Sequence, residues 1–149
     1  MKRVFLDTSP LIYLLEGEPA LRAKVSGQLA GWIQNGIWLE SSVLTLAELL
    51  VGPGKAGDAR LARQYRAAVH ELLQTPLLAV DEAVAVYGAE LRARLGLRLP
   101  DALQLSAAVL AGCDVFYTND ARLRPVDGLE IMLVNTGTGA ADRGTDRAT

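Results

Sequence analysis

Residues 3–10 of this chain read RVFLDTSP, and this stretch is the strongest indication of the fold class. Arg3 to Leu6 is an almost wholly apolar run of strand length, as expected of a strand buried on both faces. Ser9-Pro10 predicts a helix start, because proline suits the first helical turn and serine the position before it. Asp7 therefore lies between a strand and a helix, where open α/β sheets carry functional residues.

The same alternation of apolar runs and helical patterns continues along the chain. We expect helices over residues 11–15, 20–35, 45–51, 59–73, 82–95 and 101–111, and further strands over 37–39, 77–80, 115–118 and 129–134. Apolar strands separated by helices are typical of a parallel sheet covered on both faces. The prediction is an α/β fold: a three-layer α/β/α sandwich with a mainly parallel, roughly five-stranded sheet.

The length and composition limit what else this protein can be. The chain has 149 residues, which suits one domain over residues 1–135 and a polar tail over 136–149 with little to bury. Its single cysteine, Cys113, and single histidine, His70, exclude an intrachain disulfide and a Cys/His zinc site. A bound metal must therefore be held by carboxylates, which favours hard cations such as Mg²⁺ or Mn²⁺.

Charge and hydropathy give two weaker expectations. No apolar run reaches about 18 residues and the start lacks signal-peptide features, so we expect a cytoplasmic protein without a membrane segment. The net charge of −2 is unusual for a protein that binds nucleic acid. A cluster of acids around a metal would remove this objection, since the metal neutralises their charge.

Four acidic residues occupy positions where such a cluster can form. Asp7 and Asp120 directly follow predicted strands, and Glu48 and Asp101 lie at the beginning of predicted helices. In a parallel sandwich these positions share one edge of the sheet. Four carboxylates at one place repel one another unless a cation lies between them. The sequence thus predicts either a metal site or no cluster at all.

Each acid also has a purely structural interpretation. Thr45 and Glu48 have the spacing of a capping box, and Asp101 with Gln104 has the spacing of another helix start. The two acids that follow strands are also typical turn residues. On this interpretation the acids never meet.

Four short segments carry a resemblance to a known family. They are VFLDTS at residues 4–9, SVLTLAEL at 42–49, LPDA at 99–102 and YTND at 117–120. In this order and spacing, over residues 1 to about 135, the chain resembles the PIN domain family and, within it, the VapC ribonuclease toxins of toxin–antitoxin pairs. The fold that this resemblance implies is the PIN-like sandwich predicted above.

The resemblance also implies an activity and partners. Asp7, Glu48, Asp101 and Asp120 correspond to the acidic quartet that binds Mg²⁺ or Mn²⁺ in the family, and Thr118 to a supporting hydroxyl residue. The implied function is metal-dependent endoribonuclease activity that leaves 5′-phosphate ends. The implied partners are an RNA substrate, a VapB-like antitoxin and a second copy of the chain in a homodimer.

Two further sets of residues are candidates for binding. Three arginines lie within a few residues of the acids, so we expect them to contact RNA phosphates: Arg98, Arg122 and Arg124. The family resemblance implies a lysine near residue 98, and this chain carries Arg98 instead. An apolar set offers more surface than one helix pair needs, and part of it is a candidate antitoxin groove; the alternative is ordinary core. This set is Leu11, Ile12, Leu15, Leu29, Trp32 and Ile33.

Three other functions remain open from the sequence. One is a PIN-type nuclease that is not a toxin and acts in RNA processing or on DNA. Another is a non-enzymatic α/β binding module whose acids only cap helices. The third is a phosphatase, which is disfavoured because it should carry an Asp-x-Asp motif, whereas Ser9 occupies the second acidic position.

Overall fold

The computed structural model describes residues 2–137. Within these residues, no helix is both long enough and apolar enough to cross a membrane. The elements, in chain order, are β1 (Arg3–Leu6), α1 (Thr8–Glu16), α2 (Pro19–Gln34), β2 (Trp38–Glu40), α3 (Val43–Lys55), α4 (Ala59–Leu72), α5 (Glu82–Leu95), α6 (Leu99–Leu110), β3 (Val115–Thr118), β4 (Glu130–Leu133) and α7 (Val134–Gly137).

The four strands form one parallel sheet in the order β2-β1-β3-β4. Val4 of β1 is opposite Leu39 of β2 on one side and Val115 of β3 on the other. Because all strands run the same way, their carboxyl ends meet at one edge of the sheet. The residues that follow β1 and β3 are neighbours there.

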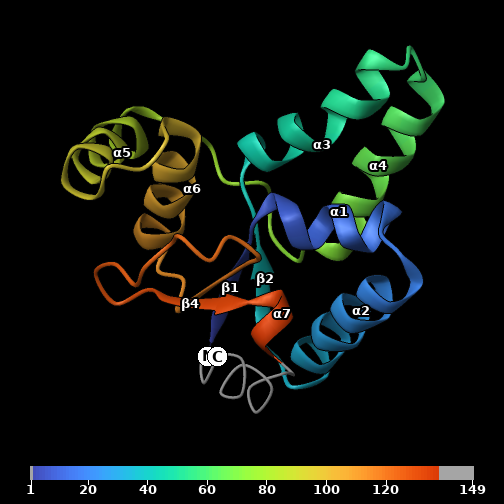
Figure 1. The fold of residues 1–149 in the computed structure, drawn as a ribbon, viewed down its shortest axis with the longest axis horizontal. Helices are drawn as coiled ribbons and strands as arrows, with labels where there is room; N and C mark the ends of the chain where they lie inside the picture. The colour runs from blue at the N-terminus through green and yellow to red at the C-terminus, as the bar shows by residue number, and fades with distance from the viewer. Residues whose placement is uncertain (1, 138–149) are drawn as a thin grey trace, which may run out of the picture.

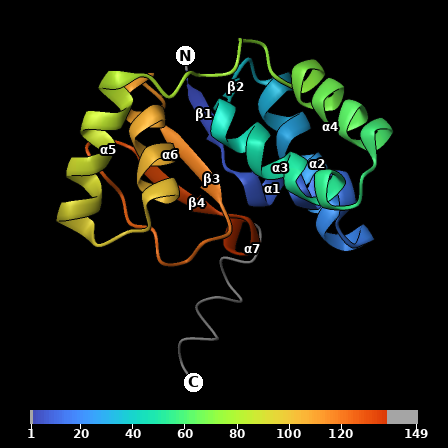
Figure 2. The same cartoon turned by 90° about the horizontal axis from the view of Figure 1, so that it is seen from above.

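Helices cover both faces of the sheet, so the predicted three-layer sandwich is confirmed (Figures 1 and 2). Successive strand residues point to opposite faces. Val4 and Leu6 pack with the core under α1 to α4, whereas Phe5 packs with the core under α5 and α6. On the second face the rings of Phe5 and Phe116 are stacked with centroids 5.1 Å apart.

The expected fifth strand over residues 77–80 is wrong. Only Leu78 pairs, in a single parallel bridge to Ser42: its N–H donates to Ser41 O and its carbonyl accepts from Val43 N, both at 2.9 Å. The pairing cannot extend, because β2 ends at Glu40 and the chain enters α3 at Val43. The sheet therefore has four strands within the described residues.

Helix ends agree with the prediction where a strong capping residue is present. The expected helix over 82–95 is confirmed: Asp81 accepts a hydrogen bond from Val84 N, and Gly96 ends the helix with a left-handed φ of 68°. In contrast, α3 does not stop at residues 52–54. It continues to Lys55 with Pro53 buried in its last turn, and the carbonyls of Gly52 and Pro53 accept hydrogen bonds from Ala56 N at 3.1 Å and Asp58 N at 2.9 Å.

Two more boundaries differ at the ends of the chain. The first helix begins at Thr8, directly after Asp7, rather than beyond Ser9-Pro10. Residues 134–137 form the short α7, which was not expected. The predicted polar tail over 136–149 therefore overlaps the end of α7, and residues 138–149 lie outside the described part of the chain.

Candidate functional site

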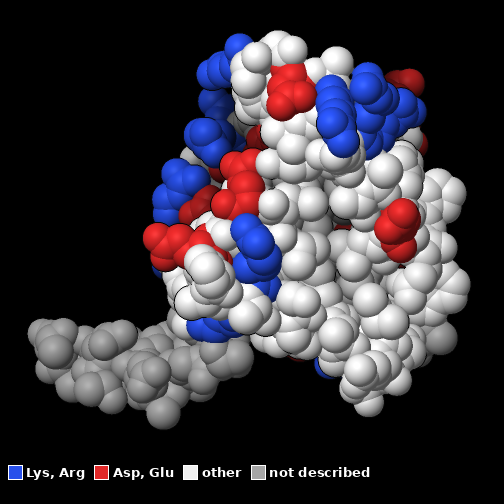
Figure 3. All heavy atoms as spheres, turned by 90° about the vertical axis from the view of Figure 1, so that its right-hand side faces the viewer, with Lys and Arg blue, Asp and Glu red and all other residues white. Residues whose placement is uncertain are grey.

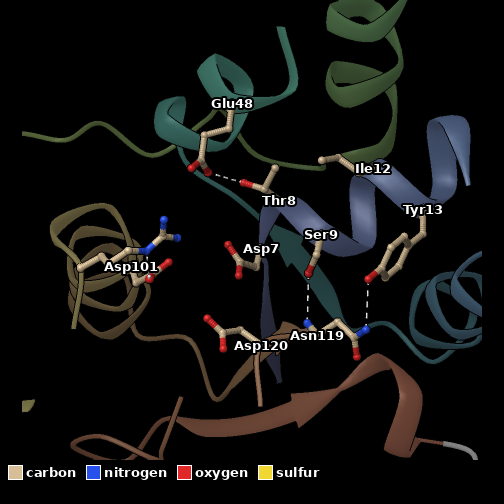
Figure 4. Close-up of a pocket in the computed structure, with 10 residues that line it drawn as sticks. Asp7, Thr8, Ser9, Ile12, Tyr13, Glu48, Asp101, Asn119 and Asp120 are labelled. Carbon is tan, nitrogen blue, oxygen red and sulfur yellow. Dashed lines mark hydrogen bonds and ion pairs between the residues drawn. The ribbon is translucent and has the colours of Figure 1, made fainter. Parts of the chain in front are cut away.

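All four predicted acids line one cavity of about 300 Å³ at the carboxyl edge of the sheet (Figure 4). They reach it from four elements, at the ends of β1 and β3 and from α3 and α6. The residues that line the cavity are Asp7, Thr8, Ser9, Ile12, Tyr13, Glu48, Arg98, Asp101, Asn119 and Asp120.

Asp7 is held at the centre of this edge by its strand neighbour. Its N–H donates to Tyr117 O at 2.9 Å, and its carboxylate accepts from the hydroxyl of Thr118 at 2.8 Å. The side chain makes no capping hydrogen bond to α1. The pKa of Asp7 is raised to about 6, mainly by burial and to a smaller extent by the negative charges of Glu48 and Asp101, against the opposing hydrogen bond from Thr118. The carboxyl is therefore destabilised in its charged form.

The capping-box interpretation of Glu48 is wrong. Ser42 caps α3 by accepting from Leu44 N and Thr45 N, so Glu48 lies in the second turn of that helix. The Glu48 carboxylate points into the cavity and accepts from the hydroxyl of Thr8 at 2.5 Å (Figure 4). It is therefore free of any role in capping α3.

The helix-cap interpretation of Asp101 is also wrong. Arg98 is the residue before α6, and Asp101 is the third residue of the helix, with its carboxylate 3.2 Å from Arg98 Nε. Gln104 turns away from it and is only 2% exposed. The Gln104 amide accepts from Ser42 Oγ at 2.5 Å and donates to Thr45 Oγ1 at 2.6 Å, which fixes the start of α6 against the start of α3.

Asp120 follows β3 and is bound by an arginine of its own loop. Its N–H donates to Thr118 Oγ1 at 3.1 Å, so the buried Thr118 hydroxyl contacts both acids that follow strands. Arg122 donates from Nε to one carboxylate oxygen of Asp120 at 2.9 Å and from Nη2 to the other at 2.6 Å. These hydrogen bonds lower the pKa of Asp120. The same Nη2 is 3.7 Å from Asp101.

The three predicted arginines take up different positions. Arg98 lines the cavity, and Arg122 pairs with two of its acids. Arg124 donates instead to the backbone carbonyls of Ala121 and Leu123, at 2.8 and 3.1 Å. The phosphate contacts expected of these arginines stay predictions.

Sequence reasoning missed a polar side of the cavity. Asn119 N donates to Ser9 Oγ at 3.0 Å, and the Asn119 amide donates to the hydroxyl of Tyr13 at 3.0 Å (Figure 4). The signal was the spacing of Ser9 and Tyr13, which puts two polar groups on the same face of an otherwise apolar helix.

The cavity has the donors that a hard cation needs. Its four carboxylates offer only oxygen ligands, as Mg²⁺ and Mn²⁺ prefer. The carboxylates surround the space without converging: within residues 2–137, no three Asp, Glu, His or Cys side chains are arranged to hold a metal ion. The chemistry of the donor set therefore fits, and the carboxylates would have to move closer together.

The fold and the position of the acidic cavity are those of an open, parallel α/β protein whose candidate site lies beyond the carboxyl ends of its strands. The family model described as PIN domain matches residues 4–129, which include all four acids. The chain belongs to the PIN domain family. No curated protein matches it in sequence.

Solved structures from toxin–antitoxin systems share the fold. One is a chain of a toxin–antitoxin complex from Klebsiella pneumoniae, with TM-score 0.67 and 23% identity over 85% of this chain and 94% of that one. A chain of VapBC2 from Rickettsia felis, bound to a promoter DNA fragment, has TM-score 0.68 and 20% identity, and the match covers 88% of this chain and 98% of that one. A chain of VapBC-5 from Mycobacterium tuberculosis has TM-score 0.59 and 25% identity over 89% and 99%.

Proposed function

We propose that this protein is a metal-dependent endoribonuclease, and that it is the toxin of a VapBC-type toxin–antitoxin pair. The observation that carries the proposal is the position of Asp7, Glu48, Asp101 and Asp120 around one cavity at the carboxyl edge of the sheet. Membership of the PIN domain family and the likeness to chains of VapBC complexes support it.

The acids would hold Mg²⁺ or Mn²⁺. We assign the principal ligands to Asp7 and Asp101, and expect Glu48 and Asp120 to contribute directly or through water. A bound divalent ion lowers the pKa of a water molecule and stabilises charge on the phosphoryl oxygens. The raised pKa of Asp7, about 6, supports this assignment, because a cation in the cavity would relieve the repulsion that contributes to it.

The remaining groups would orient these ligands and the substrate. The hydroxyls of Thr118 and Thr8 each donate to a carboxylate, which fixes the oxygen that faces the cavity. Arg98, which lines the cavity, would bind a phosphate of the substrate. Hydrolysis forms a bond from water oxygen to phosphorus and breaks the bond from phosphorus to the 3′ oxygen. That oxygen gains a proton, which leaves a 3′ hydroxyl and a 5′ phosphate.

A VapB-like antitoxin is the proposed protein partner. Of the six apolar candidates, Leu11 and Leu29 are buried in the core, whereas Ile33 is 41% exposed and Trp32 remains partly exposed. On the side formed by α1 to α4, much of the surface is uncharged, although an acidic residue interrupts it (Figure 3). We propose that an apolar antitoxin segment covers the exposed parts of Ile33 and Trp32, and Ile33→Asp should weaken the complex with a small protein encoded beside this one. The homodimer stays a prediction, which sedimentation of the purified protein can check.

The deciding experiment is cleavage of a mixed RNA pool by protein purified without a partner. Cleavage with Mg²⁺ or Mn²⁺, abolished by chelator and by Asp7→Asn, is expected. Asp114→Asn is the matched control, because Asp114 precedes β3 at the opposite edge of the sheet and its carboxylate accepts from Arg3 N. Cleavage retained by Asp7→Asn would reject the proposed site.

The same experiment separates the other functions. A single-stranded DNA pool of matched sequences tests the alternative of a DNA nuclease. A binding module would cut neither pool and would show no Mn²⁺ binding in calorimetry.

A further inference from the structure

Arg122 forms ion pairs with two of the four acids that are proposed to bind metal. Its guanidinium contacts both carboxylate oxygens of Asp120, at 2.9 and 2.6 Å, and lies 3.7 Å from an oxygen of Asp101. These acids belong to different elements, the loop after β3 and the start of α6. One positive charge therefore bridges two sides of the cavity.

The oxygens that Arg122 contacts are ones that a metal ion needs. A carboxylate oxygen that accepts a charge-assisted hydrogen bond has that lone pair engaged, and the cation beside it repels a second cation. The guanidinium is also wider than a metal ion, so a pair bridged by it stays further apart than two ligands of one ion. This agrees with the open arrangement of the four carboxylates.

We propose that Arg122 is a built-in competitor of the metal, which holds Asp120 and Asp101 until the ion displaces it. The proposal rests on the proposed function and adds a residue that sets how tightly the metal binds. The Arg122 side chain is 66% exposed, and exposed ion pairs are weak, so a divalent ion can displace the guanidinium without unfolding the loop. Once displaced, Arg122 stays beside the site with its charge unpaired, available to a phosphate of the substrate.

Other arginines near the cavity provide a comparison. Arg98 contacts one acid, Asp101, through Nε at 3.2 Å. Arg124 carries the same charge two residues beyond Arg122 but donates to backbone carbonyls. Arg124→Gln therefore removes a positive charge from the same loop without releasing a carboxylate, which makes it the matched control.

The test is calorimetric titration of the metal-free protein with Mn²⁺ at one pH and salt concentration, without RNA. Arg122→Gln should bind Mn²⁺ about fivefold more tightly than the wild type, from the usual strength of an exposed ion pair. Arg122→Lys should lie between them, because lysine cannot hold both oxygens of Asp120 at once. Arg124→Gln should bind within about twofold of the wild type, since it breaks no carboxylate pair.

Each other outcome counts against a defined part of the reasoning. Equal or weaker Mn²⁺ binding by Arg122→Gln, or an equal gain in Arg124→Gln, overturns the competitor role and leaves the nuclease proposal intact. An absence of Mn²⁺ binding in the wild type and all variants overturns both. Circular dichroism of each variant confirms that the comparison is made on folded protein.

Discussion

Replacing Asp7 by Asn should stabilise the metal-free protein at neutral and alkaline pH. Burial and the nearby charges of Glu48 and Asp101 raise the pKa of Asp7 from 3.8 to about 6. A carboxyl whose pKa is higher in the folded chain than in the unfolded chain favours folding at low pH. That contribution is complete below pH 3.8 and is lost as the pH rises through 6. Asn cannot ionise, and its side-chain oxygen can still accept the hydrogen bond from the Thr118 hydroxyl.

The magnitude follows from the two pKa values. A tenfold change in proton affinity corresponds to about 1.4 kcal/mol, so a pKa raised from 3.8 to about 6 corresponds to about 3 kcal/mol. This value is an upper limit, because the Asp7 side chain is only half-buried and solvent screens part of the effect. The free energy of unfolding of Asp7→Asn, relative to the wild type, should therefore increase by up to about 3 kcal/mol between pH 4 and pH 8.

Urea unfolding of both proteins in chelator at pH 4, 6 and 8 measures this difference. Groups outside the cavity titrate alike in the two proteins, so their contributions cancel in the difference and leave that of Asp7 and its neighbouring acids. A gain of this size moves the urea midpoint by about 1 M or more. Parallel stability curves across the pH range would refute the reasoning. Added Mn²⁺ should then stabilise the wild type more than Asp7→Asn, because only the wild type retains the carboxylate.

Three further substitutions or reagents test the structure away from the metal. Gln104→Leu should lower the free energy of unfolding by about 2–3 kcal/mol, because it leaves two buried hydroxyls without their partner; an unchanged urea midpoint would contradict this. Arg3→Met should lower the free energy of unfolding in urea by about 3 kcal/mol, because it leaves the buried Glu40, 1% exposed, without its cation. The double variant Arg3→Met, Glu40→Leu should recover much of that free energy, because it removes the unpaired charge as well. Cys113 is buried and its pKa is raised to about 12, so a disulfide reagent at pH 8 should modify it only in urea; rapid modification of the folded protein would argue against the burial.

The parts of the fold that could be predicted are those fixed by neighbouring residues. β1 and β3 were placed to the residue, because each is an apolar run that ends before polar turn residues. The helix over 82–95 was placed equally well, because Asp81 and Gly96 specify its ends. These signals are local, so the sequence alone carries them.

The errors came from contacts between segments far apart in the chain. The run at 77–80 has the composition of a strand, but its pairing depends on where β2 ends. Thr45 has the spacing of a helix cap, but it is buried against Gln104, a residue of α6. In the site, the positions directly after predicted strands located Asp7 and Asp120, whereas the ion pairs of Arg122 depend on the conformation of a loop that no local pattern specifies.

The order of strands in the sheet has a consequence for synthesis of the protein. β1 lies between β2 and β3 in the sheet, but β3 comes more than a hundred residues after β1 in the chain. Asp7 and Asp120 can therefore be brought together only after Val115–Thr118 has been translated and has paired with β1. A nascent chain that ends before this point has three of the four acids and no assembled cavity. The four acids can therefore share a cavity only after most of the described residues have left the ribosome.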